Sequence, residues 1–228
     1  MIVFDNVSLR YPYDEFSLFK DMSFTLDYGV NTVLCDTQSG KTSICKLLMK
    51  EVSPTNGKIF FDGVDIGSIA NRSLGILYLP GNPSLFLNKS VKYNLEYPLR
   101  IRRTDKNQIK DAVLSVAEKV GISDLCVRVK KLSGYERKKA ALARGLTIKR
   151  KAVLLDDFFE DSTETEDIAS VLNLFTDSIT VIFTSCPHLA CGNTVVLDGG
   201  RVVYQGDSQT AKEKVSGLGW LNDSLKEL

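Results

Sequence analysis

The segment Ser39-Gly40-Lys41-Thr42 has the residue types and spacing of a phosphate-binding turn. It follows the apolar run NTVLC at 31–35 and precedes SICKLLMKEV, in which apolar residues recur at helical steps of three and four. At such a strand–turn–helix junction, backbone N–H groups bind phosphate oxygens, a lysine neutralises the β- and γ-phosphates, and a hydroxyl ligates Mg²⁺. We therefore expect phosphate contacts from Cys35, Gln38, Ser39, Gly40, Lys41, Thr42 and Ser43.

Two positions of this turn depart from the usual eight-residue pattern. Cys35 stands where the pattern begins with glycine, and Gln38 stands where a further glycine is common. We interpret Cys35 as a small residue tolerated in place of glycine; a redox-sensitive thiol is the alternative, because a helix N-terminus lowers a thiol pKa. For this segment alone, an ordinary polar turn at the end of a strand also remains open.

Two acids that could serve the same phosphates follow a second apolar run, VLLDD at 153–157. Asp156 is expected to hold Mg²⁺ together with Thr42, and Asp157 to face the γ-phosphate. The alternative is a buried strand that runs into a solvated acidic loop, DDFFEDSTETED at 156–167.

The elements that must position these side chains alternate between strands and helices. Strands are predicted within 2–11, 22–28 and 31–36, and the non-alternating runs at 152–157 and 179–185 indicate parallel strands buried on both faces. Between 86 and 146 the pattern is helical, and one helix is expected to carry Ile109, Val113, Val116 and Val120 on a single face. Strands separated by helices predict an α/β fold.

Composition excludes several classes of protein. Lys and Arg total 29 against 28 Asp and Glu, so the chain has no basic field of the kind that nucleic-acid binding uses. No uncharged apolar run approaches the ~20 residues that span a bilayer, and the opening segment does not resemble a signal peptide. Five cysteines without a CxxC pair indicate free thiols in the cytoplasm.

The segment LSGYERKKAALARGL at 132–146 resembles the signature motif, usually LSGGQ, and the following helix of ATP-binding-cassette (ABC) ATPases. The similarity extends along the chain in order and spacing. Tyr11 resembles the aromatic residue that stacks on adenine in this family. The segments at 53–66, 82–95 and 197–207 resemble a strand pair, the opening of the helical subdomain and the last hairpin.

This resemblance implies a single ABC ATPase domain over 1–228. Residues 1–85 and 147–228 would form a P-loop NTPase (RecA-like) core with an antiparallel β subdomain, and 86–146 an inserted helical subdomain. The cofactors would be ATP and Mg²⁺. In the family, two such domains enclose two ATP molecules, so Ser133 and Gly134 would contact the nucleotide of a second domain. The implied location is cytoplasmic, on the inner face of the membrane, beside a membrane-spanning subunit.

Three positions associated with hydrolysis depart from the family pattern. Asp157 replaces the glutamate that polarises water, Gly81 the Q-loop glutamine, and Cys186 the switch histidine. Aspartate is one methylene shorter than glutamate, and misplacement of about 1 Å can cost roughly 100-fold in rate. We therefore predict a site that binds Mg-ATP and hydrolyses it slowly, with Asp157 and Cys186 at the catalytic positions. Thr163 similarly replaces the D-loop aspartate.

The leading hypothesis is an ATP-binding subunit of an ABC transporter that donates its signature motif to a partner with a complete Walker site. The alternative is an ATP-sensing ABC module that docks a soluble partner without transport. A P-loop kinase or GTPase would leave the segment at 132–146 unexplained.

Overall fold

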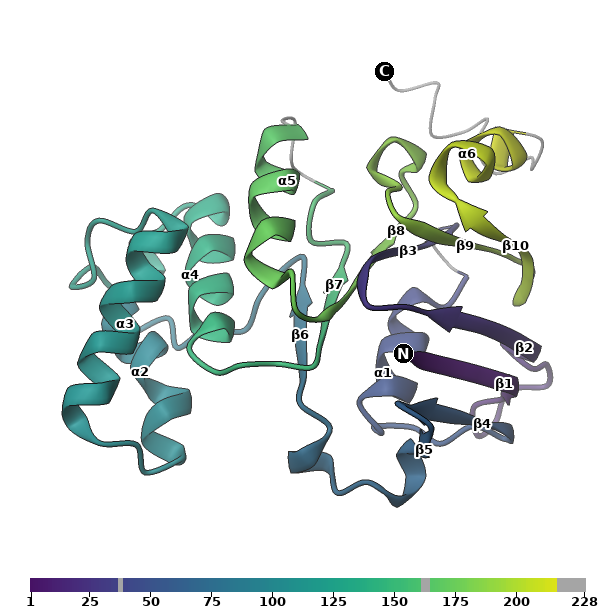
Figure 1. The fold of residues 1–228 in the computed structure, drawn as a ribbon, viewed down its shortest axis with the longest axis horizontal. Helices are drawn as coiled ribbons and strands as arrows, with labels where there is room; N and C mark the ends of the chain where they lie inside the picture. Colours follow the sequence, from purple (N-terminus) through teal and green to yellow (C-terminus); the bar gives the residue numbers. More distant parts are fainter. Residues whose placement is uncertain (37–38, 161–164, 217–228) are drawn as a thin grey trace. The chain divides into compact units, whose positions relative to one another are not determined.

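The structure is a computed structural model that describes residues 1–36, 39–160 and 165–216 (Figure 1). It divides the chain into two compact units. The first combines Met1–Tyr78 with the chain from Lys151 onward, and the second comprises Leu79–Arg150. The first unit contains both sheets except for Leu79 and Pro80 at the end of one edge strand, and the second is built mainly from helices, so each is described separately.

One sheet of the first unit is antiparallel, with strand order β2-β1-β4-β5. Side chains in β1 alternate between buried and more exposed positions, and the Phe4 and Phe24 rings stack at 4.2 Å between centroids. The predicted strand at 22–28 begins earlier, at Phe19, and ends at Leu26. The bounds are β1 Ile2–Leu9, β2 Phe19–Leu26, β4 Asn56–Phe61 and β5 Val64–Asp65.

The other sheet has the order β10-β9-β3-β8-β7-β6. Strand β3 is parallel to β8 and β9, β7 is parallel to β8, and every residue of β7 and β8 is buried, which confirms the predicted parallel strands. Parallel strands end at one edge of a sheet, so β3, β8 and β7 bring their carboxyl ends to the same edge. The bounds are β3 Gly29–Cys35, β6 Ile76–Pro80, β7 Ala152–Asp156, β8 Ile179–Thr184, β9 Asn193–Asp198 and β10 Arg201–Asp207.

The described residues of the first unit form three α-helices: α1 (Lys41–Leu48), α5 (Thr165–Leu172) and α6 (Ser208–Ser216). Helix α1 follows β3 directly and buries Ile44, Cys45, Leu47 and Leu48 in the core shared by both sheets. Helix α6 packs on β9 and β10. The junction between β3 and α1 is therefore anchored on both sides by buried residues.

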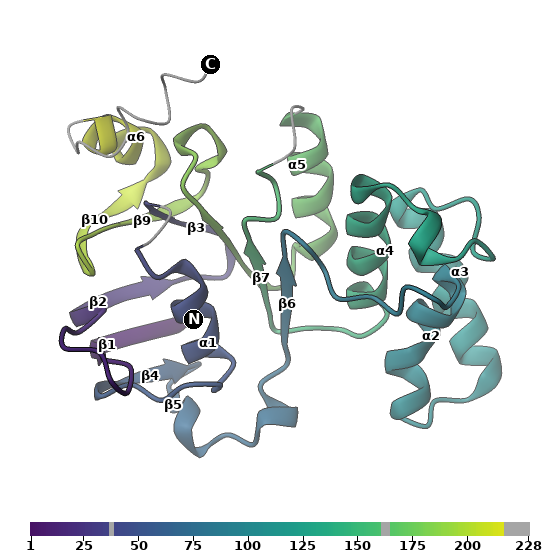
Figure 2. The ribbon, with the colours of Figure 1, turned by 180° about the vertical axis from the view of Figure 1, so that it is seen from behind.

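The second unit contains α2 (Val91–Ile101), α3 (Lys106–Val120) and α4 (Gly134–Leu146), which pack against one another (Figure 2). Each begins at a polar N-cap, Ser90, Asp105 or Ser133, whose side chain accepts a backbone N–H of the first turn. The predicted apolar face of α3 is confirmed, because Ile109, Val113, Val116 and Val120 are buried. None of the helices in the described ranges has the length and apolarity that crossing a lipid bilayer demands.

Candidate functional site

Gly40 forms the turn that leads from β3 into α1. Its backbone is left-handed, with φ of 91°, and it occupies the N-cap of the helix. A Cβ at this position would lie 2.6 Å from the Phe19 ring and 3.1 Å from a Leu18 methyl group. Only glycine meets both conditions without strain, so the turn needs a glycine here for structural reasons.

Lys41 is the first residue of α1, and its side chain is 4% exposed. Its Nζ lies 2.6 Å from Asp157 Oδ1 and 3.6 Å from Glu160 Oε1. Burial acts to lower the pKa of Lys41, but the hydrogen bond and charge of Asp157 prevail and raise it. The lysine is therefore a cation that two carboxylates hold in place.

The next residue, Thr42, contacts Asp156, the acid that immediately precedes Asp157. Thr42 Oγ1 donates to Asp156 Oδ2 at 3.1 Å, and the Tyr78 hydroxyl donates to the same oxygen at 2.8 Å. Asp156 is 5% exposed, and its Oδ1 is buried without a hydrogen-bond partner in the described part of the chain. Burial raises the pKa of Asp156, and the two hydroxyl contacts oppose that rise.

Asp157 follows β7 in a left-handed conformation, with φ of 51°. Its backbone N–H donates to the Phe183 carbonyl at 3.0 Å, which ties the turn to the end of β8. Aspartate tolerates this backbone region better than most residues do. The turn thereby directs the carboxylate of Asp157 to Lys41, whereas the carboxylate of Asp156 accepts a hydrogen bond from Thr42.

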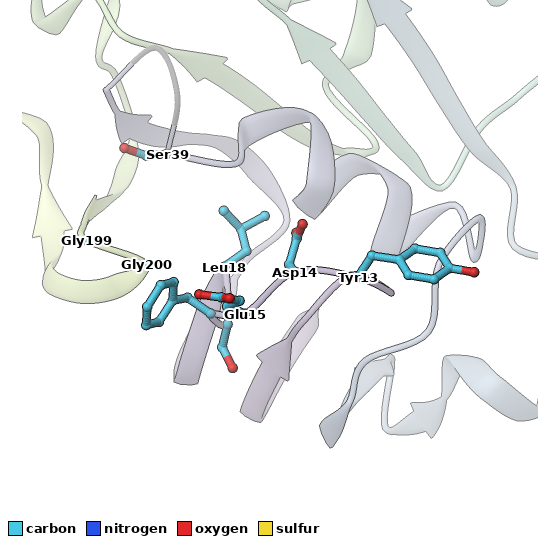
Figure 3. A pocket seen from close by; sticks show the side chains of 9 residues that line it. Tyr13, Asp14, Glu15, Leu18, Ser39, Gly199 and Gly200 are labelled. Carbon is cyan, nitrogen blue, oxygen red and sulfur yellow. The ribbon is translucent and has the colours of Figure 1, made fainter.

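Tyr11 lies beside the helix rather than in open solvent. Its hydroxyl donates to Ser43 Oγ at 3.0 Å, and its ring packs partly against the core. Figure 3 shows an adjacent pocket lined by the loop at 13–18, by Ser39 and by the Gly199-Gly200 turn between β9 and β10. Tyr13 is fully exposed at the far end of this pocket from the glycine turn.

Two cysteines lie close to the site, Cys35 as the last residue of β3 and Cys186 two residues after the end of β8. Cys35 is completely buried, and burial raises the pKa of its thiol to about 12, so a reactive thiol is wrong for this position. Cys186 follows β8 and is half-buried, with its backbone N–H bonded to Thr184 Oγ1 at 3.0 Å. Ser185 Oγ donates to Glu160 Oε1 at 3.4 Å.

The remaining predicted residues lie elsewhere. Ser133 and Gly134 belong to the second unit, where Glu136 Oε2 accepts from the Ser133 backbone N–H at 2.8 Å and from its hydroxyl at 2.9 Å. Glu136 N–H donates back to Ser133 Oγ at 3.2 Å, which closes a capping box at the start of α4. Gly81 also belongs to the second unit. Gln38 and Thr163 lie outside the described residues.

Two residues of this cluster were missed from the sequence. Tyr78 reaches Asp156 because β6 is the neighbour of β7, and strand order cannot be read from a single sequence. Glu160 lies three residues after Asp157 in the acidic loop, and this spacing was a signal that could have found it. Tyr78 contacts Asp156 directly, and Glu160 shares Lys41 with Asp157.

Comparison with known proteins finds an ABC transporter family model and ATP-binding proteins of uptake systems. The family model described as "ABC transporter" matches residues 19–160, which is more than half of the chain. A molybdate/tungstate import ATP-binding protein from Thermococcus kodakarensis is 35% identical over 149 residues, covering 64% of this chain and 45% of that protein. A tungstate uptake system ATP-binding protein from Peptoclostridium acidaminophilum is 29% identical over 206 residues, covering 86% of this chain and 94% of that protein.

The fold has a counterpart among solved structures. A bacterial Atm1-family ABC exporter with ATP bound superposes with a TM-score of 0.81, at 22% identity, over 99% of this chain and 42% of that chain. The chain spans about half the length of several curated importer proteins that it matches. The chain therefore has an α/β fold that is known from solved structures.

Proposed function

Because this chain belongs to the ABC transporter family of ATP-binding domains, as its motifs predicted, we propose that it is the ATP-binding subunit of an ABC transporter. Residues 1–228 would form one ATPase domain, with 86–146 as its helical subdomain. The subunit would bind Mg-ATP, pair with a second nucleotide-binding domain and drive a separate membrane subunit from the cytoplasmic side. The relatives are named for molybdate and tungstate uptake. For this chain we propose the ATP-binding role alone and no transported substrate.

Four side chains support nucleotide binding most directly. Lys41 and Thr42 begin α1, and each lies within hydrogen-bonding distance of one of the two acids that end β7, at 2.6 and 3.1 Å. A cation, a hydroxyl and two carboxylates at the mouth of a helix are the groups that a magnesium-complexed triphosphate requires. Ser39, Gly40 and Ser43 would complete the phosphate cradle, and the Tyr11 ring would stack on the adenine base of ATP.

Thr42 and Asp156 would hold Mg²⁺. The buried Asp156 Oδ1 has no partner in the described part of the chain, which leaves one carboxylate oxygen for a hard cation. The Thr42 hydroxyl uses its single hydrogen on Asp156, so its lone pairs are available to a metal. When bound, the ion would neutralise charge on the phosphate oxygens.

We further propose that hydrolysis at this site is slow. Asp157 would have to orient water with a side chain one methylene shorter than glutamate, and it also forms the ion pair with Lys41. A thiol is a poor hydrogen-bond donor, so Cys186 would contribute less to the γ-phosphate than an imidazole. Binding groups are thus retained, and the groups that activate water are altered.

The helical unit offers a surface for the membrane subunit. Phe86 and Leu87 are 39% and 47% exposed, and the Phe86 ring makes edge contacts with Tyr93 and Tyr97. The nearby apolar residue Val91 is buried and does not contribute to this surface. Exposed apolar side chains grouped in this way favour a protein contact.

The test compares the wild-type chain with the Asp157→Glu, Cys186→His double variant. Equilibrium binding of fluorescent ATP and steady-state phosphate release are measured for both. We expect similar affinities and a turnover at least tenfold higher in the double variant, which places the deficiency at the chemical step. Absence of ATP binding by the wild-type chain would refute the proposed function, and wild-type turnover near the ~10 s⁻¹ typical of enzymes would refute slow hydrolysis.

A further inference from the structure

We propose that Tyr78 is a positioning residue for the magnesium site, through a hydrogen bond that orients Asp156. This inference rests on the proposed Mg-ATP site and adds a residue that belongs to none of the nucleotide-binding motifs. Tyr78 lies on β6, beside β7 in the sheet, and is half-buried against the core.

The contacts on Asp156 are unequal between its two oxygens. Oδ2 accepts both hydroxyl hydrogens, from Tyr78 at 2.8 Å and from Thr42 at 3.1 Å, whereas Oδ1 has no partner in the described ranges. Two donors on one oxygen fix the rotation of a carboxyl group, because turning it would break both bonds. Tyr78, together with Thr42, therefore determines which oxygen remains available to a cation.

The chemistry of the donor suits this task. A phenol supplies one hydrogen and no charge, so Asp156 keeps its full negative charge for a metal ion. A lysine in the same place would neutralise the carboxylate, and Lys41 is instead paired with the neighbouring Asp157. Of the two donors to Asp156 Oδ2, Tyr78 makes the shorter contact and is not itself a proposed metal ligand, whereas the Thr42 hydroxyl is.

Removing such an outer-shell partner typically weakens metal binding by 10–100-fold. Tyr78→Phe keeps the ring and its packing and removes only the hydroxyl. We expect about a tenfold increase in the Mg²⁺ concentration needed to saturate nucleotide binding. Nucleotide affinity measured with a chelator, without divalent metal, should stay within about twofold of the wild type.

Tyr28→Phe is the matched control. The Tyr28 hydroxyl also contacts a carboxylate, Asp62, at 3.1 Å, but this pair lies outside the nucleotide site. Fluorescent ATP is titrated with Mg²⁺ for wild type and both variants, and Mn²⁺ bound in the ATP complex is measured by electron paramagnetic resonance. Thermal unfolding of each variant shows whether the fold is retained.

The outcomes separate this inference from the proposed function. A selective loss of Mg²⁺ and Mn²⁺ affinity in Tyr78→Phe supports the positioning role. Unchanged metal dependence, or an equal loss of nucleotide affinity with and without metal, overturns the positioning role alone. A wild-type chain that binds no nucleotide under either condition overturns the proposed function and this inference with it.

Discussion

At the level of single residues, Lys41 is held in place before any phosphate arrives. Its Nζ contacts Asp157 at 2.6 Å and Glu160 at 3.6 Å, and its side chain is almost fully buried. A bound triphosphate would bring further negative charge to the same cation. The phosphates of the proposed nucleotide would therefore compete with two carboxylates for Lys41, and those carboxylates would repel the phosphates.

Glu160→Gln should consequently strengthen nucleotide binding. The Glu160 side chain is 38% exposed, so solvent screens its pair with Lys41, and we expect an effect of about threefold in the dissociation constant. Glu213→Gln on α6 makes the same charge change at an exposed position outside the site and should have no effect. Isothermal titration with Mg-ATP decides the matter: equal or weaker binding by Glu160→Gln would show that Glu160 does not compete.

Site residues that belong to a short sequence motif could be predicted, whereas those that depend on contacts between distant segments could not. Lys41, Thr42 and the two acids at 156 and 157 belong to short segments whose neighbours predict a strand and a turn, and the structure brings these four together. Tyr78 could not be predicted, because its contact with Asp156 arises only when β6 and β7 become neighbours. Long-range pairing of this kind leaves no periodic trace in a sequence.

At the level of elements, the start of α1 depends on packing against β2. Phe19 is fully buried, and its ring would lie only 2.6 Å from a Cβ built on Gly40. The left-handed turn and this close approach together determine where the first N–H groups of α1 lie. The geometry of the proposed phosphate cradle thus depends on Phe19, a residue of the antiparallel sheet.

Gly40→Ala should destabilise the fold more than glycine replacement at an open left-handed turn does. Gly63, between β4 and β5, has φ of 79° and no neighbour within 4 Å of a built Cβ. Gly63→Ala therefore measures the backbone strain alone, about 1–2 kcal/mol, and Gly40→Ala should cost roughly 1–3 kcal/mol more because of overpacking. Urea unfolding of both variants gives the difference, and equal losses would rule out the packing argument.

The elements themselves were more predictable than their boundaries. Strands β7 and β8 were recognised because continuous apolar runs indicate burial on both faces, and the spacing of apolar residues identified α3. Strand β2 begins at Phe19, three residues before the predicted start, because Phe19 pairs with Leu9 in the antiparallel sheet. Such a boundary is decided by the partner strand and not by the residues of the segment.

At the level of the whole molecule, the proposed pairing with a second domain depends on the start of α4. Ser133 would offer its N–H and hydroxyl to the γ-phosphate bound by the partner. In the structure, Glu136 already accepts both groups, at 2.8 and 2.9 Å. The hydrogen bonds from the Ser133 backbone and side chain lower the pKa of Glu136, so its carboxylate is ionised at neutral pH.

Glu136→Gln should therefore favour ATP-dependent dimerisation. Glutamine retains the capping geometry and removes the charge that would face a phosphate, and we expect the dimer dissociation constant to fall roughly tenfold with Mg-ATP present. Glu118→Gln on α3 is the charge-matched control at an exposed site of the same unit. Sedimentation equilibrium gives the dissociation constants, with and without Mg-ATP. If Glu136→Gln dimerises no better than Glu118→Gln, then the charge of Glu136 does not oppose pairing.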